Sequence, residues 1–553
     1  MLTASVTAEA QPNDAHHATN TDSTRTRRLA MDAQRAFEAF RRSRLPEGPA
    51  SSGRCEVRVG RYCYWRGDDD SEPGPPAEVA AIVERRNALI GTLANAASAL
   101  PGDGWIAGQR VRYLAEANRA DEAAQAADAE CRATPVLCNS LSGYAAHIAS
   151  RFAAADSAFR RAVDAMAPDE RCRLFDVAEL LTDELAERFN TLDCVSREAF
   201  ARRLFRIGAP LYSVSETDLL TEYLTRRTRT RIVERAASTD GQSWGDDARA
   251  LVVRYGWSRW YTRASPSPGS QRESSYTGHD VGLPYYFLPS RHALDSAGHA
   301  TVDDWELEAA RAPTGYAPVY ARSIHRLTHQ IASFRRGDST LVVGAWDARD
   351  DSTLAGHALE AALVLAGDGG RSTVTRRSAG TVGTITVTGV VDSGLVSLEL
   401  VAAEDRRAAR ARIGVPARAA GDIAVSGLML HEPTPVPADF AAAVERALSS
   451  AVINVDRGVS VYWEVYGIPA DRPVRYRLTL EEMPGGWLRR MAERVHLADS
   501  SRELRIEWEE MPRVVNGVGA RDIQLNVGRL HKGRYLMQIA AGNAVSAREV
   551  ELR

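Results

Sequence analysis

Lysine is almost absent from this sequence of 553 residues: Lys532 is the single lysine, and arginine replaces it elsewhere. The bias runs through every segment, which indicates a GC-rich genome rather than selection for bidentate arginine contacts. The net charge is only −3, so the large positive field of a typical nucleic-acid-binding protein is missing as well. Acidic residues lie near the basic run Arg226–Arg231, which we interpret as a solvated helix face. The composition therefore predicts no nucleic-acid partner.

Long apolar runs are absent too. No run reaches 18 consecutive apolar residues, so we expect no transmembrane helix and no integral membrane protein. Ala8-Glu9-Ala10, followed by Gln11-Pro12, is similar to the small-residue end of a secretory signal peptide. The charged and apolar regions that precede such an end are missing; a start codon assigned too late would explain this, and a disordered tail is the alternative.

The signatures of common enzymes are also missing. The sequence contains no G-x-S-x-G elbow, no Walker A motif and no G-x-G-x-x-G after a strand. Glu509 and Glu510 lie on a predicted strand and point to opposite faces, which does not suit a joint acid–base role. We therefore predict no catalytic residue and no cofactor-binding residue.

A metal site is not expected either. His325 and His329 have i, i+4 spacing on a predicted helix, a spacing that can bind zinc. The sequence between them lacks the glutamate of the zinc protease motif, and neither His279 nor His292 upstream is an obvious third ligand.

Cysteine is confined to the first 200 residues, where six cysteines fall into three close pairs. None has the C-x-x-C spacing of zinc or redox sites. An even number of locally paired cysteines is typical of an oxidising compartment, and six buried free thiols are the alternative. The expected disulfides join nearest neighbours: Cys55–Cys63, Cys131–Cys138 and Cys172–Cys194.

The hydrophobic period changes from 3.6 to 2 near Thr340, which predicts a multidomain α + β protein with a helical front and an antiparallel back. Both strand-rich segments have the short, turn-separated strands of immunoglobulin-like β-sandwiches. The predicted segments are a disordered leader (1–27), a helix with a disulfide hairpin (28–76), a tetratricopeptide-like helical domain (77–237), an irregular segment (238–335), a first sandwich (336–432), a linker with a short helix (433–450) and a second sandwich (451–553).

An internal repeat supports the helical domain. In a tetratricopeptide, small residues let two helices approach, and an aromatic residue fills the seam to the next repeat. One unit matches this spacing at Gly143, Ala155, Phe159, Ala162 and Pro168. The unit before it aligns at Val111, Ala123 and Ala127, with Pro135 one position out of step. About three units are needed for a continuous core, so we expect helices at 77–99 and 172–188 to complete the stack.

Five residues, Trp244, Asp247, Arg254, Tyr255 and Gly256, carry a resemblance to the GWxTD domain family. The segment 243–247 is similar to the family's Gly-Trp-x-Thr-Asp, and the segment 254–256 is similar to the Arg-Tyr-Gly that ends the next strand. The sequence departs from the pattern at Ser243, Asp246 and Ser258, where the family has Gly, Thr and Pro.

The resemblance extends over about residues 196–553, through segments at 197–200, 278–279, 287–289, 425–428, 462–467 and 533–536. It implies an exported bacterial protein with this architecture, located in the periplasm or outside the cell, and it implies no reaction. Asp247 is expected to cap a turn and Trp244 to pack between the helical part and the first sandwich. A ligand-stacking platform of Trp244 with Trp257 and Trp260 is the alternative.

Two functions follow as hypotheses. The first is a non-enzymatic interaction or scaffold protein outside the cytoplasm, whose repeat groove binds a protein or peptide. The second is a hydrolase with a site in the irregular 238–330 segment, because long irregular segments are often functional. Its candidate residues are Asp246, Asp247, His279, His325 and His329, and the hypothesis requires that they converge in a cleft.

We predict that the native protein shows no free thiol. Intact mass after alkylation should be unchanged without a reductant and should show six modified cysteines after reduction. Labelling of any cysteine in the unreduced, unfolded protein would contradict the proposed pairing.

Overall fold

The protein is described from a computed structural model, which covers residues 14–48, 55–64, 76–264, 275–279, 284–308, 311–417, 423–433, 437–468, 472–483 and 503–553. The chain forms two compact units with interleaved segments. The first unit consists of Met1–Pro210, Ser215–Leu288 and Glu306–Arg322, and the second of Leu211–Val214, Pro289–Trp305 and Ser323–Arg553. The chain therefore passes between the units five times.

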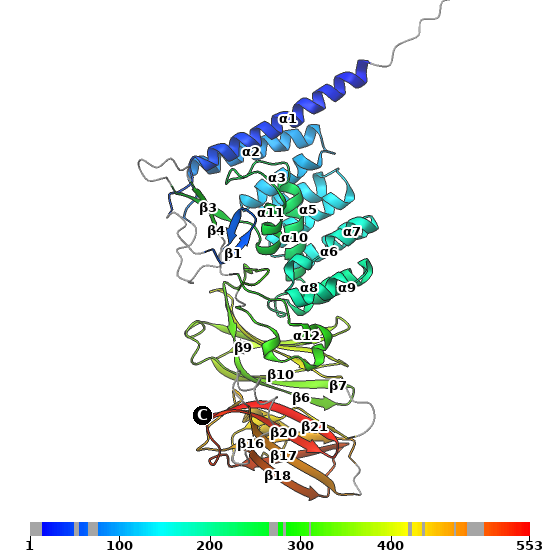
Figure 1. The fold of residues 1–553 in the computed structure, drawn as a ribbon, viewed down its shortest axis with the longest axis vertical. Coiled ribbons are helices and arrows are strands. Elements are labelled where there is room, and N and C mark those ends of the chain that lie inside the picture. The colour runs from blue at the N-terminus through cyan, green and yellow to red at the C-terminus, as the bar shows by residue number, and fades with distance from the viewer. Residues whose placement is uncertain are drawn as a thin grey trace, which may run out of the picture. The chain divides into compact units, whose positions relative to one another are not determined.

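The first unit is helical (Figure 1). Its helices are α1 (Asp14–Arg42), α2 (Ala80–Ala99), α3 (Gly104–Glu116), α4 (Ala120–Gln125), η1 (Ala126–Glu130), α5 (Pro135–Ile148), α6 (Phe152–Asp164), α7 (Pro168–Leu174), η2 (Ala178–Leu180), α8 (Asp183–Asn190), α9 (Cys194–Ile207), α10 (Asp218–Val233) and α11 (Asp246–Tyr255). Two short hairpins accompany them: β1 (Val57–Val59) with β2 (Tyr62–Tyr64), and β3 (Trp260–Ala264) with β4 (Ser275–His279).

Side-chain caps set several helix starts. Asp103 accepts the N–H groups of Trp105 and Ile106 at the start of α3, and Thr134 accepts the N–H of Leu137 at the start of α5. Pro135 occupies the first turn of α5, where no N–H partner is needed. Buried residues of α1, α2, α3 and α5, among them Phe37, Leu93, Val111 and Leu141, then form one core.

Helix α10 packs on α5, α3, α6 and α9. Of its 16 residues, 13 are buried, although the helix is rich in arginine and threonine. The face that α3 and α5 present is thus covered by the chain's own helix. The interpretation of the Arg226–Arg231 run as a solvated face is wrong for Arg226 and Arg229, which are buried because carboxylates pair with both of them.

The structure differs from the predicted helices in two places. Helix α1 begins at Asp14, so residues 14–27 are not an irregular leader; extending a helix that Ala30 and Phe37 anchor costs less than nucleating one. The single helix expected at 172–188 is instead α7, η2 and α8, because Asp176 and Thr182 start new turns.

The second unit is rich in β-sheet, and its first half has two facing sheets (Figure 1). A three-stranded sheet has the order β10-β7-β6, and a five-stranded sheet has the order β5-β12-β11-β8-β9. Apolar side chains from both sheets, such as Trp346 and Leu398, share one core. The strands are β5 (Ser323–Arg326), β6 (Thr328–Arg336), β7 (Ser339–Asp347), β8 (Leu359–Gly367), β9 (Ser372–Ala379), β10 (Val382–Gly389), β11 (Gly394–Ala402) and β12 (Arg407–Val415).

The second half also has two facing sheets. Strand β16 pairs with β13, β14 and β19, and a five-stranded sheet has the order β15-β21-β20-β17-β18. Trp463 of the first sheet and Tyr476 of the second lie in their common core. The elements are β13 (Ala424–Val425), β14 (Met429–His431), α13 (Phe440–Glu445), β15 (Val452–Ile453), β16 (Val459–Tyr466), β17 (Val474–Glu482), β18 (Glu503–Glu510), β19 (Val518–Leu525), β20 (Gly533–Ala541) and β21 (Ala544–Leu552). The immunoglobulin-like class of both halves stays a prediction.

A buried carboxylate fixes the short segment Leu211–Val214 within the second unit. Glu399 of β11 accepts the N–H groups of Tyr212 (2.8 Å) and Ser213 (2.9 Å) and the Ser397 hydroxyl (2.7 Å). The guanidinium of Arg412 lies 4.4 Å from the Tyr212 ring centre, a cation–π contact. The elements α12 (Arg291–Asp295), η3 (Ala297–His299) and η4 (Val302–Asp304) belong to the same unit.

Two glycines test the close approach of α5 and α6. A β-carbon at Gly143 would lie 2.8 Å from the Phe159 ring, whereas one at Gly91 of α2 would meet nothing within 4 Å. We expect Gly143→Ala to lower the free energy of unfolding by about 1–3 kcal/mol through overpacking. Gly91→Ala should raise it by about 0.5–1 kcal/mol through helix propensity. Denaturant unfolding of both variants measures this, and a stabilising Gly143→Ala would contradict the packing.

Candidate functional site

The segment 243–256 that carries the family resemblance forms a turn and then helix α11. A strand was expected after Asp247, and this expectation is wrong: two acidic residues in the first turn and the apolar spacing Ala248, Val252 and Tyr255 favour a helix. Trp244 is partly exposed, and its predicted packing role stays a prediction.

Asp247 holds the tip of the disulfide hairpin β1–β2. Its carboxylate accepts the Arg61 backbone N–H (3.2 Å), Nε (2.7 Å) and Nη2 (2.9 Å). These bonds from Arg61 hold the pKa of Asp247 well below its usual range. Gly60 lies beside the carboxylate with φ of 55°, and a β-carbon there would be 2.4 Å from Cβ of Asp247. The motif aspartate therefore fixes the hairpin, in addition to accepting the N–H of Ala248 (2.9 Å).

Arg254, Tyr255 and Gly256 continue this role at the end of α11. The Tyr255 ring stacks on Tyr64 of β2 with ring centres 3.9 Å apart. Its hydroxyl donates to the Ala312 carbonyl (2.8 Å), and Arg254 Nε donates to the Pro313 carbonyl (2.7 Å). Gly256 has φ of 85°, a conformation that favours glycine at a helix end. These residues join α11 to the hairpin and to the 312–316 loop.

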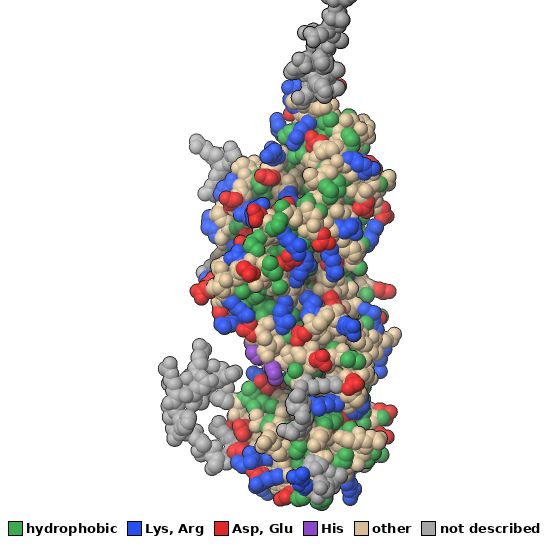
Figure 2. Space-filling view, turned by 90° about the vertical axis from the view of Figure 1, so that its right-hand side faces the viewer, with side chains coloured by type: hydrophobic (Ala, Val, Ile, Leu, Met, Phe, Trp, Pro, Cys, Tyr) green, Lys and Arg blue, Asp and Glu red, His purple; other side chains and the backbone are tan. Residues whose placement is uncertain are grey.

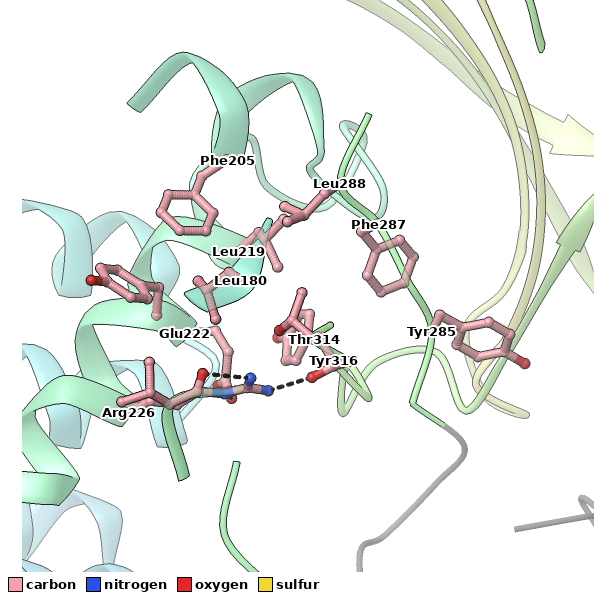
Figure 3. A pocket seen from close by; sticks show the side chains of 13 residues that line it. Leu180, Phe205, Leu219, Glu222, Arg226, Tyr285, Phe287, Leu288, Thr314 and Tyr316 are labelled. Atoms are coloured by element: carbon pink, nitrogen blue, oxygen red, sulfur yellow. Dashed lines mark hydrogen bonds and ion pairs between the residues drawn. The ribbon is translucent and has the colours of Figure 1, made fainter. Parts of the chain in front are cut away.

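Arg226 of α10 completes this assembly (Figure 3). Its Nε donates to Glu222 Oε1 (2.5 Å), Nη1 to the Arg254 carbonyl (2.8 Å) and Nη2 to the Gly315 carbonyl (2.8 Å). One buried guanidinium thus joins α10, the C-terminal end of α11 and the 312–316 loop. All three of its nitrogen atoms donate a hydrogen bond, as the planar guanidinium of arginine allows.

Beside Arg226 lies a small cavity (Figure 3). Glu222 and Arg226 lie at one side of it. The rest of its wall is mainly leucine and aromatic side chains: Leu180, Phe205, Leu219, Tyr223, Tyr285, Phe287, Leu288 and Tyr316. The volume that the centre of a water molecule can occupy in it is ≈ 20 Å³, which leaves room for about one or two waters. A typical small-molecule pocket is far larger. We therefore interpret it as a packing space and not as a substrate pocket.

His147 of α5 and two residues of α10 lie in the order hydroxyl, imidazole, carboxylate. Nδ1 is 2.9 Å from Thr221 Oγ1, and Nε2 is 2.8 Å from Glu222 Oε2. The Thr221 hydroxyl donates to the Asp218 carbonyl (3.0 Å). All three side chains are buried, and the threonine proton is already donated. The group therefore binds α10 to α5 and does not act as a nucleophile–base pair.

Glu222 lies between the Arg226 guanidinium and the His147 imidazole. Burial acts to raise its pKa, but Arg226 and His147 outweigh that effect and bring the pKa well below its usual range. Asp218, one turn earlier, has no such cation. Burial raises the pKa of Asp218 to about 7, against the opposing effect of the hydrogen bond from the Tyr320 hydroxyl.

The five residues of the hydrolase hypothesis have other partners. Asp246 pairs with Arg249 (3.6 Å), and His279 stacks on Trp260 (3.9 Å) and contacts Thr262. His325 and His329 lie on β5 and β6 and not on the predicted helix, because β5 pairs with β12 and β6 pairs with β7. His325 contacts Ser323 (2.6 Å); burial lowers the pKa of His329 to about 4, and its Nδ1 contacts the Leu327 carbonyl.

Within the described ranges, no group of three or more histidine, cysteine and acidic side chains is placed to hold a metal ion. His292 contacts Asp304 (3.0 Å) within the second unit. Trp257 and Trp260 have separate surroundings: Trp257 lies between the guanidinium groups of Arg229 (5.4 Å) and Arg259 (4.5 Å), while Trp260 stacks on His279.

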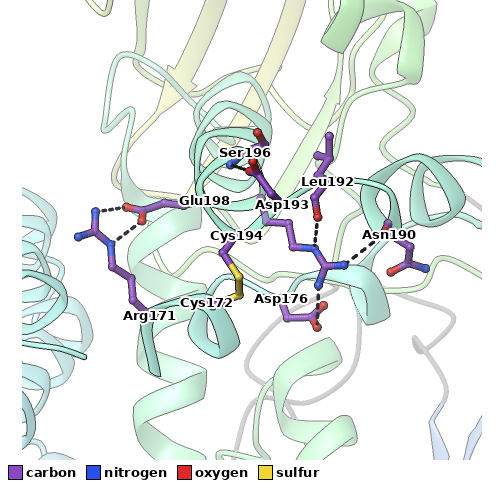
Figure 4. The surroundings of a disulfide bond; sticks show 10 residues. Arg171, Cys172, Asp176, Asn190, Leu192, Asp193, Cys194, Ser196 and Glu198 are labelled. Carbon is purple, nitrogen blue, oxygen red and sulfur yellow. Dashed lines mark hydrogen bonds and ion pairs between the residues drawn. A yellow bond between two sulfur atoms is a disulfide. The ribbon is translucent and has the colours of Figure 1, made fainter. Parts of the chain in front are cut away.

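The six cysteines form the pairs Cys55–Cys63, Cys131–Cys138 and Cys172–Cys194, which are the nearest neighbours expected from the sequence. The last of these joins α7 to α9 (Figure 4). Arg171, next to Cys172, makes a two-pronged ion pair with Glu198 (2.6 and 3.1 Å), and Asp193, next to Cys194, caps α9 through the N–H of Ser196 (2.8 Å). The disulfide therefore lies within a surface already held by ion pairs.

Sequence reasoning missed His147, Asp218, Glu222 and Tyr320. In the sequence, the one sign of this group is the i, i+4 pair Glu222–Arg226, and such a pair is equally typical of an exposed helix. The partner His147 lies 75 residues away from Glu222, and nothing in the local pattern indicates it.

Comparison with known proteins gives no family. No family model matches the chain, and no curated protein matches it. A tetra-tandem repeat in the extending region of a large adhesion protein is similar over 41% of this chain, with 11% identity and a TM-score of 0.13; the chain covers 49% of that structure, about half its length. The FN1–FN3 domains of chicken CNTN1 are similar over 51% of this chain and 82% of theirs, with 8% identity and a TM-score of 0.15. TM-scores this low carry no argument about function.

Where the chain is described, none of its helices combines the length and the apolar character that a membrane crossing requires. Figure 2 shows arginine and acidic side chains intermixed over the face in view, without a patch of one sign.

Asp218 gives a prediction about pH. Because burial raises its folded-state pKa from 3.8 to about 7, its contribution favours folding at low pH and is lost as pH rises towards 7. Asp218→Asn keeps an acceptor for Tyr320 without the ionisation. Relative to the parent, this variant should gain about 2–3 kcal/mol of unfolding free energy between pH 5 and pH 8. Urea unfolding at both pH values measures it, and an equal difference at the two pH values would contradict the burial of an ionisable Asp218.

Proposed function

We propose that this protein is a non-enzymatic interaction or scaffold protein that acts outside the cytoplasm. One observation supports the proposal above the others: the polar side chains with the best geometry for chemistry are engaged in joining helices, hairpin and loop. Asp247 holds Arg61, Glu222 binds His147, and Arg226 binds three elements at once. A side chain whose lone pairs and protons are already matched in a buried position has little capacity to turn over a substrate.

Export is supported by the disulfides. Cystines persist in oxidising compartments and are rare where thiol reductants act, and all six cysteines of this chain are paired. The periplasm and the extracellular space both satisfy this argument.

We also propose three finer assignments. The chain is a divergent member of the GWxTD domain family, supported by the structural role of Asp247, Arg254, Tyr255 and Gly256. The helical pairs α3–α4 and α5–α6 are tetratricopeptide-like, with Gly143 against Phe159 at the seam. The two pairs of facing sheets are immunoglobulin-like sandwiches.

The partner surface follows from the position of α10. Because α10 covers the face of α3 and α5, a protein or peptide partner of the folded chain must use the remaining helical surface. The exposed side of α6, which carries Ser157, Arg160 and Arg161, is such a surface. This side also carries the exposed Asp164, so its charge is mixed, which suits recognition of a folded protein more than of a polyanion.

A photo-crosslinking experiment tests the proposal. A photoreactive amino acid replaces Ser157 on α6, or Thr386 on the exposed face of β10 as a matched control, in the full chain expressed in its own host. We expect a specific crosslinked band in the envelope fraction with the α6 probe and a weaker or different one with the β10 probe. Recovery of no specific partner from either position would count against an interaction function, and a cytoplasmic location of the chain would count against export.

A further inference from the structure

Strand β18 (Glu503–Glu510) forms one border of its five-stranded sheet. Its partner within the described residues is β17, in a continuous antiparallel register from Glu481↔Glu503 to Val474↔Glu510. The opposite side of β18 therefore carries a row of backbone N–H and C=O groups over eight residues, and such a row is a template for another strand.

Three other sheet borders in this unit are protected, and β18 differs from them. Strands β5 and β15 are short, with four and two residues. Strand β9 is long, but its core-facing row includes Arg377, whose guanidinium lies 5.5 Å from the Trp346 ring centre, so a charge points inward. The core-facing row of β18 is Leu504, Ile506 and Trp508, which pack on the core yet stay half-buried. A half-buried apolar row on the border strand of a sheet can be covered by another strand that pairs with this border.

The outer row of β18 has a self-complementary order of charges: Glu503, Arg505, Glu507 and Glu509. If a second β18 is laid antiparallel with Ile506 opposite Ile506, Arg505 of each copy lies opposite Glu507 of the other. In the core-facing row, Leu504 then lies opposite Trp508. Glu503 meets Glu509 at the two ends. Within each copy, Glu507 also accepts from Arg475 (3.0 Å) and Arg477 (2.9 Å) of β17 and from Arg505 (3.0 Å), so this outer row is a cluster of alternating charges. In this arrangement both central charge pairs are favourable.

We propose that two copies of this chain associate through β18, antiparallel about a two-fold axis at Ile506, so that the two five-stranded sheets become one continuous sheet. The contact is isologous, and it closes on itself as a dimer. The inference goes beyond the proposed function, because it requires no other protein.

Charge reversal tests the register in the full-length protein. Sedimentation velocity over a concentration series should show a monomer–dimer equilibrium for the parent. Arg505→Glu or Glu507→Arg alone should each raise the dissociation constant roughly tenfold or more, because like charges then face each other twice. A mixture of the two single variants should associate again, because each supplies what the other lacks. Arg534→Glu, which breaks an equally exposed ion pair with Glu549 (2.6 Å) away from the border, should leave association unchanged.

A cysteine crosslink gives a second measurement that does not depend on charge. All native cysteines are in disulfides, so Ile506→Cys introduces the only free thiol. Opposed residues of antiparallel strands have β-carbons about 4.5–5.5 Å apart, close to what a disulfide spans. Ile506→Cys should form a covalent dimer on mild oxidation, and Leu504→Cys should do so only when mixed with Trp508→Cys.

Three results would overturn the proposal: a parent that stays monomeric across the series, a dimer that neither charge reversal weakens, or Ile506→Cys that remains uncrosslinked while Arg534→Glu weakens association.

Discussion

The first unit depends on the pairing of buried charges on one helix. Helix α10 has arginine, threonine and glutamate where a core helix usually has apolar residues, and it is nevertheless buried on almost all sides. Apart from Asp218, the buried charged side chains of α10 have partners of opposite charge or imidazole: Glu222 has His147 and Arg226, and Arg229 binds Glu116 at 2.9 Å. Glu116 in turn binds Arg112 and Arg41, and Arg112 reaches Glu38 of α1. Breaking one such pair leaves a buried charge uncompensated, which costs on the order of 3–5 kcal/mol. The repeat and α10 are therefore best understood as one folding unit.

This polar core explains why the motif segment is structural. Arg226 extends the network from α10 to α11 and to the 312–316 loop, and Asp247 and Tyr255 extend it to the hairpin that Cys55–Cys63 closes. The residues that resemble a family signature thus determine how helix, hairpin and loop meet. A signature of this kind can persist in a family without a common reaction, because what it preserves is a set of contacts.

The sequence predicted the parts of the fold that have a local cause. The change of period near Thr340 and the three cysteine pairs both depend on neighbours in the chain. The failures have a non-local cause. The Arg226–Arg231 run was interpreted as solvated because acidic residues lie near it in the sequence. Arg226 and Arg229 are buried instead, and the partner of Arg229 is Glu116, 113 residues away. His325 and His329 fit a helical spacing, but pairing of β5 with β12 and of β6 with β7 decides their conformation. Nothing in the repeat itself indicates that α10 packs on α3 and α5.

The interleaving of the two units affects how this protein can be divided. Residues 211–214, held by Glu399, interrupt the helical unit between α9 and α10, and residues 289–305 interrupt it again. No single cut in the polypeptide therefore yields two intact halves. Gene fusion or recombination at one point would separate one of the units from a segment that belongs to it. The helical and sheet-rich parts are therefore constrained to be inherited together, unlike modules joined by one linker.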